Sequence, residues 1–192
     1  MTQIICGIDE VGRGPWAGPV LATAVILPDP LPDFFAQVTD SKKLSVKKRD
    51  ALYPQLIECC QFGIGMASVQ EIDQLNILRA TFLAMERAFA ALPVRPDFAF
   101  VDGNKLPQLP CRAEAVIGGD AKVPAIAAAS IIAKVTRDKI MADLDREFPG
   151  YDWAKNAGYG TKSHQNGLAN MGVTPHHRAS FAPIRAILEK VA

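Results

Sequence analysis

The first apolar run of the chain constrains its fold most, because it ends in two adjacent carboxylates, Asp9 and Glu10. The run over residues 4–8 indicates a short buried strand, and a glycine-rich turn at residues 12–19 follows directly. The two acids therefore come at the tip of the strand, beside a bare backbone that a substrate can approach closely. Carboxylates next to Arg13 and open N–H groups favour metal-assisted phosphate chemistry, whereas the simpler alternative is a solvated turn.

Length and composition limit the class of protein. The 192 residues fit one domain, 1–192, and 49% hydrophobic with 21% charged residues is the composition of an ordinary globular protein. The chain has no apolar stretch of about 18 residues, which argues against a membrane span. No basic segment precedes the first apolar run, which argues against a signal peptide. The cysteines show no CxxC pairing, so we expect free thiols and a cytoplasmic protein.

Charge is distributed unevenly, although the net charge is only +1. Cations outnumber acids in residues 40–49 and again after residue 151, while many acids lie in the middle of the chain. Such segregation favours a basic rim around an acidic centre, as an enzyme that grips a polyanion needs. Solvated helix faces explain any single cluster equally well.

The hydrophobic pattern predicts an α/β fold. We expect strands at residues 4–9, 20–27, 62–69, 98–101 and 111–117. We expect helices from Ser45, an N-cap, to about residue 60, from residue 72 to before Pro93, and from residue 125 to about 148. Small helices and loops follow from about residue 151. Strands first, and then strands alternating with helices, indicate a mixed sheet flanked by helices.

Two further acids share the context of the opening pair. Asp102 leaves a predicted strand just before Gly103, and Asp120 follows two glycines ahead of the long helix. Because sites in α/β sheets collect at strand ends, these acids and the opening pair are expected to converge. Alternation along a strand sends Asp9 and Glu10 to opposite faces, so Glu10 must already have turned out of the strand. Taken singly, Asp102 also fits a turn residue and Asp120 a helix-entry acid.

Clustered carboxylates repel one another and stay ionised only if cations neutralise them. Mg²⁺ and Mn²⁺ are the hard ions that suit oxygen ligands, and two such ions about 3.5–4 Å apart can promote phosphodiester cleavage.

Two glycine-containing segments could instead indicate a nucleotide-binding loop, but their residue spacing does not fit one. Residues 12–18 depart from the dinucleotide fingerprint, and residues 160–163 lack the GK[ST] order of a phosphate loop.

Eight segments of the sequence carry a family resemblance. They are residues 7–15 (GIDEVGRGP), 17–19 (AGP), 40–44 (DSKKL), 101–104 (VDGN), 119–120 (GD), 127–138 (AAASIIAKVTRD), 158–162 (GYGTK) and 177–181 (HRASF). In this order, and over nearly the whole chain, they closely resemble the type 2 ribonucleases H of bacteria, the ribonuclease HII family. The resemblance implies a ribonuclease H-like mixed sheet with flanking helices and a small helical C-terminal extension at about residues 151–192.

The resemblance also implies an activity. The expected reaction is endonucleolytic cleavage of RNA in RNA–DNA hybrids, and nicking on the 5′ side of single ribonucleotides in duplex DNA, as in ribonucleotide excision repair. Products would carry a 3′-hydroxyl and a 5′-phosphate. The cofactor would be Mn²⁺ or Mg²⁺, with two ions when substrate is bound. By motif, the metal-binding carboxylates correspond to Asp9, Glu10, Asp102 and Asp120.

Substrate contacts follow from the same resemblance. The backbone of Gly12, Arg13 and Gly14 matches the segment that senses the ribose 2′-hydroxyl, the group that distinguishes RNA from DNA. Tyr159 matches the aromatic residue that packs on the sugar at the RNA-to-DNA junction. From their charge alone, Lys42 and Lys43 are candidate phosphate contacts, although a solvated face explains them about equally well. Weaker candidates for the same contact are Lys162, Arg178 and Ser180. The three histidines are expected to be structural or surface residues rather than catalytic ones.

Two other functions stay open at the level of sequence. One is a non-catalytic module that binds RNA–DNA hybrids, although a binder of polyanions gains nothing from four acids. The other is a phosphotransferase that uses the glycine loop. One departure from the family motifs is Ala157 before Gly158, where serine is more usual. No C-terminal clamp-binding peptide is evident, and we expect a monomer.

Overall fold

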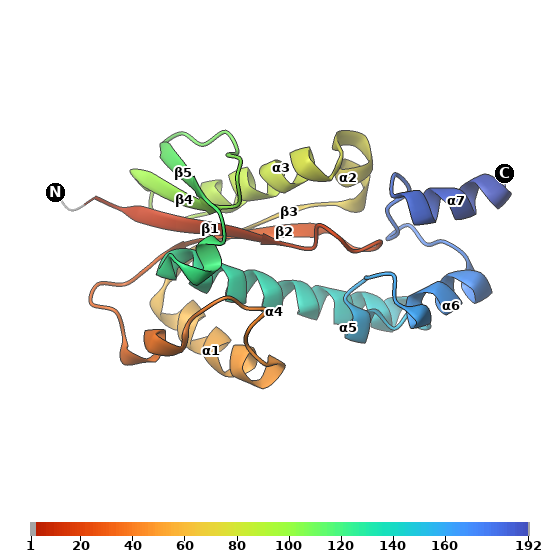
Figure 1. Cartoon of the computed structure of the whole chain (residues 1–192), viewed down its shortest axis with the longest axis horizontal. Helices are drawn as coiled ribbons and strands as arrows, with labels where there is room; N and C mark the ends of the chain where they lie inside the picture. Colours follow the sequence, from red (N-terminus) through yellow and green to blue (C-terminus); the bar gives the residue numbers. More distant parts are fainter. Residues whose placement is uncertain (1–2, 192) are drawn as a thin grey trace.

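The computed structural model describes residues 3–191 and contains one mixed five-stranded sheet with helices on both faces (Figure 1). The strand order is β3-β2-β1-β4-β5, so that β1, the strand that carries Asp9 and Glu10, is central. β1 is antiparallel to β2 and parallel to β4; β2 and β3 are antiparallel, and β4 and β5 are parallel. The strands are β1 (Ile5–Val11), β2 (Val20–Ile26), β3 (Gln61–Ala67), β4 (Phe98–Asp102) and β5 (Arg112–Val116). The predicted mixed sheet with flanking helices is confirmed.

Helices cover the sheet on its two sides and continue beyond its end (Figure 1). One face carries α2 (Val69–Leu75) and α3 (Ile77–Ala90), and the other carries α1 (Val46–Cys59) and α4 (Pro124–Glu147). Short 3₁₀ turns occur at Asp33–Gln37 and Gly119–Ala121, and the C-terminal helices are α5 (Trp153–Asn156), α6 (Lys162–Met171) and α7 (Ala182–Val191). Ser45 caps α1 as predicted. Within residues 3–191, no helix is long and apolar enough to cross a membrane.

The helix predicted from residue 72 to before Pro93 is in fact two helices. Asn76 lies between α2 and α3 with φ of 69°, and its side chain accepts hydrogen bonds from the backbone N–H groups of Leu78 and Arg79. The apolar spacing continues across this break, which is why periodicity alone predicts a single helix. α2 also begins earlier, with a capping box between Ser68 and Glu71, so the predicted strand at 62–69 runs past the true end of β3.

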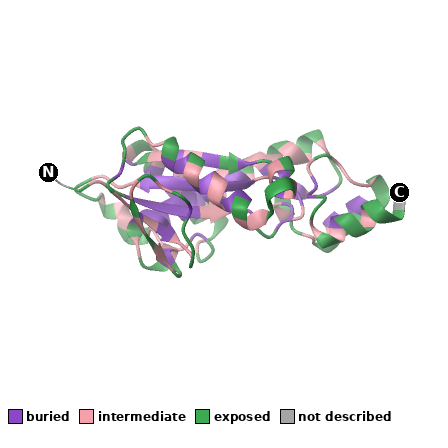
Figure 2. Cartoon of the chain, turned by 90° about the horizontal axis from the view of Figure 1, so that it is seen from above, coloured by how far each residue is buried: buried purple, intermediate pink, exposed green. Residues whose placement is uncertain are grey.

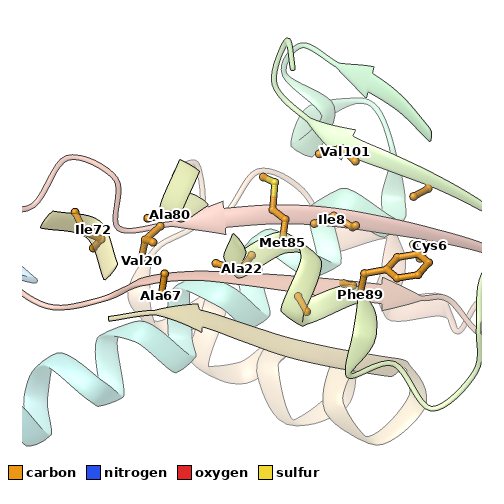
Figure 3. Close-up of a cluster of buried hydrophobic side chains, with 14 residues drawn as sticks. Cys6, Ile8, Val20, Ala22, Ala67, Ile72, Ala80, Met85, Phe89 and Val101 are labelled. Carbon is orange, nitrogen blue, oxygen red and sulfur yellow. The ribbon is translucent and has the colours of Figure 1, made fainter. Parts of the chain in front are cut away.

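The core holds β1 rigidly between two helix layers. Ile8 and Val101 are fully buried and belong to one cluster with Met85 and Phe89 of α3 (Figure 3). On the opposite face, a Cβ atom at Gly7 would overlap the backbone of α4 at Ala125, so a glycine is required where strand and helix approach. Buried residues concentrate in the strands, while the outer helix faces are exposed (Figure 2). The tip of β1 is therefore held in place by packing.

A separate cluster fixes the C-terminal helices to the end of α4. Met141 of α4 packs with Tyr151, Trp153 and Leu168. His164 and His177 lie inside this cluster, at 0% and 3% exposure, and their rings contact the tyrosine and indole rings. The expectation that the histidines are structural or surface residues holds for these two, which are buried.

Burial of His177 predicts an acid-sensitive fold. Desolvation, with a contribution from the neighbouring His164, lowers the pKa of His177 from 6.5 to about 4. The unfolded chain therefore binds this proton at a higher pH than the folded protein, and stability is lost as the pH falls below 6.5. We expect the free energy of unfolding to fall by about 2 kcal/mol between pH 7 and pH 5 from this group. Urea titrations of wild type and His177→Phe measure it; equal pH dependence in both proteins contradicts the prediction.

Candidate active site

Three of the four predicted carboxylates converge at one end of the sheet. One oxygen from each of Asp9, Glu10 and Asp102 lies within 4.8 Å of the others. The register explains the pairing of the two aspartates: Ile8 of β1 lies opposite Val101 of β4 in a parallel pair, so the next residues, Asp9 and Asp102, are at the same level. The carboxyl ends of parallel strands thus bring together acids that are 93 residues apart.

The expectation that Glu10 has left the strand is wrong. β1 continues to Val11, and Glu10 stays paired with Ala22 of β2. Alternation makes Asp9 share the α4 face with Gly7, so Glu10 points to the α3 face. The two side chains still meet because β4 ends at Asp102, which leaves the edge of β1 open beyond this level. Both carboxylates therefore reach the open edge, one from each face.

Burial and mutual repulsion both disfavour the ionised forms of Asp9 and Glu10. Asp9 is only 6% exposed, and burial raises the pKa of its carboxyl well above the ordinary value of 3.8, with the charges of Glu10 and Asp102 adding to the effect. Burial also raises the pKa of Glu10, which Arg13 opposes through an ion pair of 3.5 Å. Three hard oxygen donors that repel one another fit a divalent cation such as Mg²⁺ or Mn²⁺.

Asp120 lies beside this group without belonging to the three-residue cluster. It sits in the 3₁₀ turn Gly119–Ala121, and the N–H of Gly119 donates to Asp102 Oδ1 at 2.7 Å. Burial raises the pKa of Asp120, and the charges of Asp40 and Asp102 raise it further. Asp40 is thus a fifth acid that sequence reasoning did not select, although it opens the segment DSKKL.

The two lysines of that segment differ. Burial alone lowers the pKa of Lys42, but nearby carboxylates raise it above its ordinary value. These carboxylates are those of Asp9, Asp120, Asp40 and Glu10. Lys42 therefore faces the acidic centre. Lys43 is exposed and donates its backbone N–H to the carbonyl of Asp40, so its side chain is free to face solvent.

A polar cleft opens from the acids toward α3. Its volume is about 310 Å³, and Glu10, Arg13 and Asp102 line it together with the loop that follows β4. Thr81, Phe82 and Met85 of α3 form its opposite wall. A larger, mostly apolar hollow of about 550 Å³ lies against α6 and α7, but none of the described residues that line it carries a side-chain carboxylate. The polar cleft lies beside the three clustered carboxylates, and its mixture of acidic and basic side chains suits a phosphate backbone.

The structure brings Tyr159 to the glycine turn, as the two predicted sugar contacts require. A Cβ atom at Gly14 would lie 3.2 Å from Cε1 of Tyr159, so the ring packs directly over this glycine. Tyr159 is 49% exposed, which leaves much of its surface open to a ligand. The turn and the ring come from opposite ends of the chain and form one surface beside Arg13.

Two buried arginines hold the glycine turn from behind. The guanidinium of Arg178 is fully buried and donates to the carbonyls of Gly12 at 2.6 Å, Arg13 at 2.9 Å and Gly18 at 2.8 Å. Arg137, at 1% exposure, donates to the carbonyls of Ala17, Pro19 and Ala157. With these carbonyls held inward, the opposite side of the turn is left for a ligand.

A phosphate contact by Arg178 is therefore wrong, because its side chain is enclosed. Burial and the charge of Arg137 lower the pKa of Arg178 to about 9, which still leaves a cation at pH 7.

The sequence did not predict that Arg137 and Arg178 support the glycine turn. They lie in the segments AAASIIAKVTRD and HRASF, but nothing in the spacing marks them as buried. Of the other weak candidates, Ser180 is bound to Asp73, and Lys162 is exposed at the start of α6.

The fold and the acidic cleft define a protein of the ribonuclease H-like class, and solved structures agree. Ribonuclease H2 from Pyrococcus horikoshii OT3 superposes with a TM-score of 0.81 at 25% identity, covering 97% of each chain. Bst-RNase HIII in complex with Mn²⁺ gives a TM-score of 0.78 at 18% identity, covering 98% of this chain and 70% of that one. The second likeness supports the fold alone.

The family follows from sequence. The model of the family Ribonuclease HII matches residues 6–184. Ribonuclease HII of Ruegeria pomeroyi is 56% identical over 186 residues, covering 96% of this chain and 78% of that protein. Ribonuclease HII of Magnetococcus marinus is 56% identical over 190 residues, covering 97% and 88%. The chain belongs to the ribonuclease HII family and is an endoribonuclease of the ribonuclease H type, active on RNA–DNA hybrids.

Proposed function

We propose that this endonuclease also nicks duplex DNA on the 5′ side of a single embedded ribonucleotide, leaving a 3′-hydroxyl and a 5′-phosphate. The observation that carries the proposal is the position of Tyr159 over Gly14, next to the acidic cleft. A backbone turn that senses one 2′-hydroxyl and a ring that packs on the following deoxyribose recognise a single junction. Recognition by this turn and this ring does not require a long RNA strand.

We propose that Asp9, Glu10, Asp102 and Asp120 hold two Mg²⁺ or Mn²⁺ ions when substrate is bound. The convergence of three of them within 4.8 Å and the closeness of Asp120 to Asp102 support this assignment. Divalent ions held by these carboxylates would supply charge stabilisation and would activate a water for phosphodiester hydrolysis. The protein supplies the ligands, and Lys42 and Lys43 are proposed to contact the flanking phosphates.

We propose further that residues 1–192 act as one catalytic domain, including the helical extension at about 151–192. The support is that the two parts build one surface: Tyr159 and Arg178 come from the extension, and both contact the glycine turn that follows β1. A chain that ends before residue 151 would lose both contacts.

The direct test uses purified protein with Mg²⁺ or Mn²⁺ and a DNA duplex that carries one ribonucleotide. A nick on the 5′ side of that ribonucleotide is expected, with a long RNA–DNA hybrid as the positive control. Cleavage of the hybrid without any nick in the duplex would reject the proposal and leave the family activity intact. Binding of both substrates without cleavage in either metal would instead favour a non-catalytic hybrid-binding module.

Tyr159→Ala tests the reading of the junction. We expect it to lower kcat/KM for the single-ribonucleotide duplex about tenfold more than for a long hybrid, since covering one face of an aromatic ring removes apolar area worth about 1–2 kcal/mol. Tyr159→Phe is the matched control, because it keeps the ring and loses only the hydroxyl, and it should preserve the preference. Equal losses on both substrates in Tyr159→Ala would count against the role.

A further inference from the structure

A buried chain of hydrogen bonds connects the C-terminal segment to the backbone of Tyr159. Nε2 of His177 and Nε2 of His164 lie 3.0 Å apart, and Nδ1 of His164 lies 3.0 Å from the carbonyl oxygen of Tyr159. At the other end, the backbone N–H of Thr174 reaches Nδ1 of His177 at 2.9 Å. We call His164 and His177 the histidine pair. It runs from the loop after α6 to the residue proposed to read the sugar.

Two groups that can only donate determine where the protons of the pair lie. The N–H of Thr174 donates to Nδ1 of His177, so that nitrogen carries no proton and the proton of the neutral ring is on Nε2. The indole N–H of Trp153 donates to Nε2 of His164 at 3.1 Å, so that nitrogen also accepts and the proton of His164 is on Nδ1. Both assignments agree: His177 donates to His164, which donates to Tyr159.

Every hydrogen bond of the chain is therefore donated in the same direction, toward the carbonyl oxygen of Tyr159. That carbonyl also accepts from the backbone N–H of Thr161 at 2.8 Å, so both of its acceptor positions are used. Both histidines are buried, and desolvation lowers the pKa of each, which keeps them neutral. A proton added to His164 would face the N–H groups of Trp153 and His177 and would break the chain.

The next residue along the chain supports the other half of the same surface. Arg178 donates to the carbonyls of Gly12 and Arg13, while His177 forms an antiparallel bridge with Ala17. Two adjacent residues thus support the two parts of the sugar-contacting surface, one through the turn and one through the ring.

We propose that the histidine pair is a positioning element that holds Tyr159 over Gly14 and so determines how strongly the enzyme distinguishes a single ribonucleotide from continuous RNA. The inference rests on the proposed role of Tyr159 in the function above. Neither histidine touches the reacting phosphate in this assignment. The pair acts through the backbone at Tyr159, and its loss should therefore change substrate preference more than cleavage itself.

His164→Leu and His164→Asn form the discriminating pair of variants. Leucine removes the donor to Tyr159, whereas the amide of asparagine has an N–H near the place of Nδ1. We expect His164→Leu to lower the ratio of kcat/KM for the single-ribonucleotide duplex to that for a long hybrid about tenfold, the factor of one lost buried hydrogen bond. His164→Asn should return the ratio to within about threefold of wild type. His176→Leu, a neighbouring histidine outside the pair, is the control and should keep the wild-type ratio.

An unchanged ratio in His164→Leu, with a wild type that nicks the duplex, would overturn this inference alone. A wild type that cleaves only the long hybrid would reject the proposed function and, with it, the link to substrate choice. Proton positions in the wild-type protein give a test that needs no variant. Long-range ¹H–¹⁵N correlation at pH 7 should place the proton of His177 on Nε2 and that of His164 on Nδ1; the opposite assignment of either ring contradicts the proposal.

Discussion

Asp9→Asn is expected to lower kcat on an RNA–DNA hybrid by at least about 1,000-fold in either Mg²⁺ or Mn²⁺, equivalent to about 4 kcal/mol of lost transition-state stabilisation. Asp9 is the most enclosed of the proposed ligands, and one of its oxygens lies within 4.8 Å of oxygens of Glu10 and Asp102. Asparagine keeps the size of the side chain and an oxygen that can still accept the N–H of Glu10, now bound at 2.8 Å. The variant therefore removes a charge with little change in packing.

The same variant is expected to be more stable than wild type when no metal is present. The pKa of Asp9 is raised above its ordinary 3.8 in the folded protein, so ionising it opposes folding. The unfolded chain releases this proton near pH 4, and the penalty therefore grows as the pH rises above 4 up to the folded pKa. The gain in stability of Asp9→Asn should be present at pH 7 and vanish below about pH 4.

Thermal unfolding in EDTA and in Mg²⁺ measures this difference. Wild type should gain more in Tm from Mg²⁺ than the variant does, because a cation that binds the folded state stabilises it. Asp50→Asn, the same change at an exposed position of α1, should leave both activity and Tm unchanged. Asp9→Asn with activity within tenfold of wild type, or with a lower Tm in EDTA, would contradict the metal assignment.

The strands and long helices were predictable because they follow simple periodicities. The buried run before Asp9 and the apolar residues of α4 place both elements to within one or two residues. What periodicity does not contain is the break at Asn76, since the apolar stripe continues through it and only the cap geometry ends α2. Boundaries of this kind depend on one side chain and its hydrogen bonds.

The candidate site also has features that the sequence predicts and features that it does not. The meeting of Asp9 with Asp102 follows from strand ends in a parallel pair, which sequence order already suggests. The way in which Glu10 reaches the site cannot be predicted from sequence order, because it depends on where β4 ends relative to β1. The partners of Arg178 are carbonyl oxygens of the backbone 160 or more residues away, and no residue type marks a carbonyl in a sequence. From the sequence alone, Arg178 is equally consistent with a surface contact, and only the folded structure shows that it is buried.

Arg178→Met is the second change with a large expected effect. Methionine fills much of the volume but donates no hydrogen bond, so the carbonyls of Gly12, Arg13 and Gly18 lose their buried partner. We expect the free energy of unfolding to fall by about 3–5 kcal/mol, because each unsatisfied buried acceptor costs about 1–3 kcal/mol. Cleavage of the single-ribonucleotide duplex should fall more than cleavage of a long hybrid, since the turn that contacts the sugar loses its support.

Arg178→Lys and Arg185→Met separate the geometry from the charge. Lysine keeps the charge but replaces the planar donors of the guanidinium with a single ammonium group, so it should recover only part of the stability and little of the substrate preference. Arg185 is exposed on α7, and its loss should change the unfolding free energy by less than about 0.5 kcal/mol. Chemical denaturation and paired kcat/KM measurements on the three variants decide the matter. If lysine matches arginine in both, the charge alone supports the turn, and the directed hydrogen bonds of the guanidinium are not what holds it.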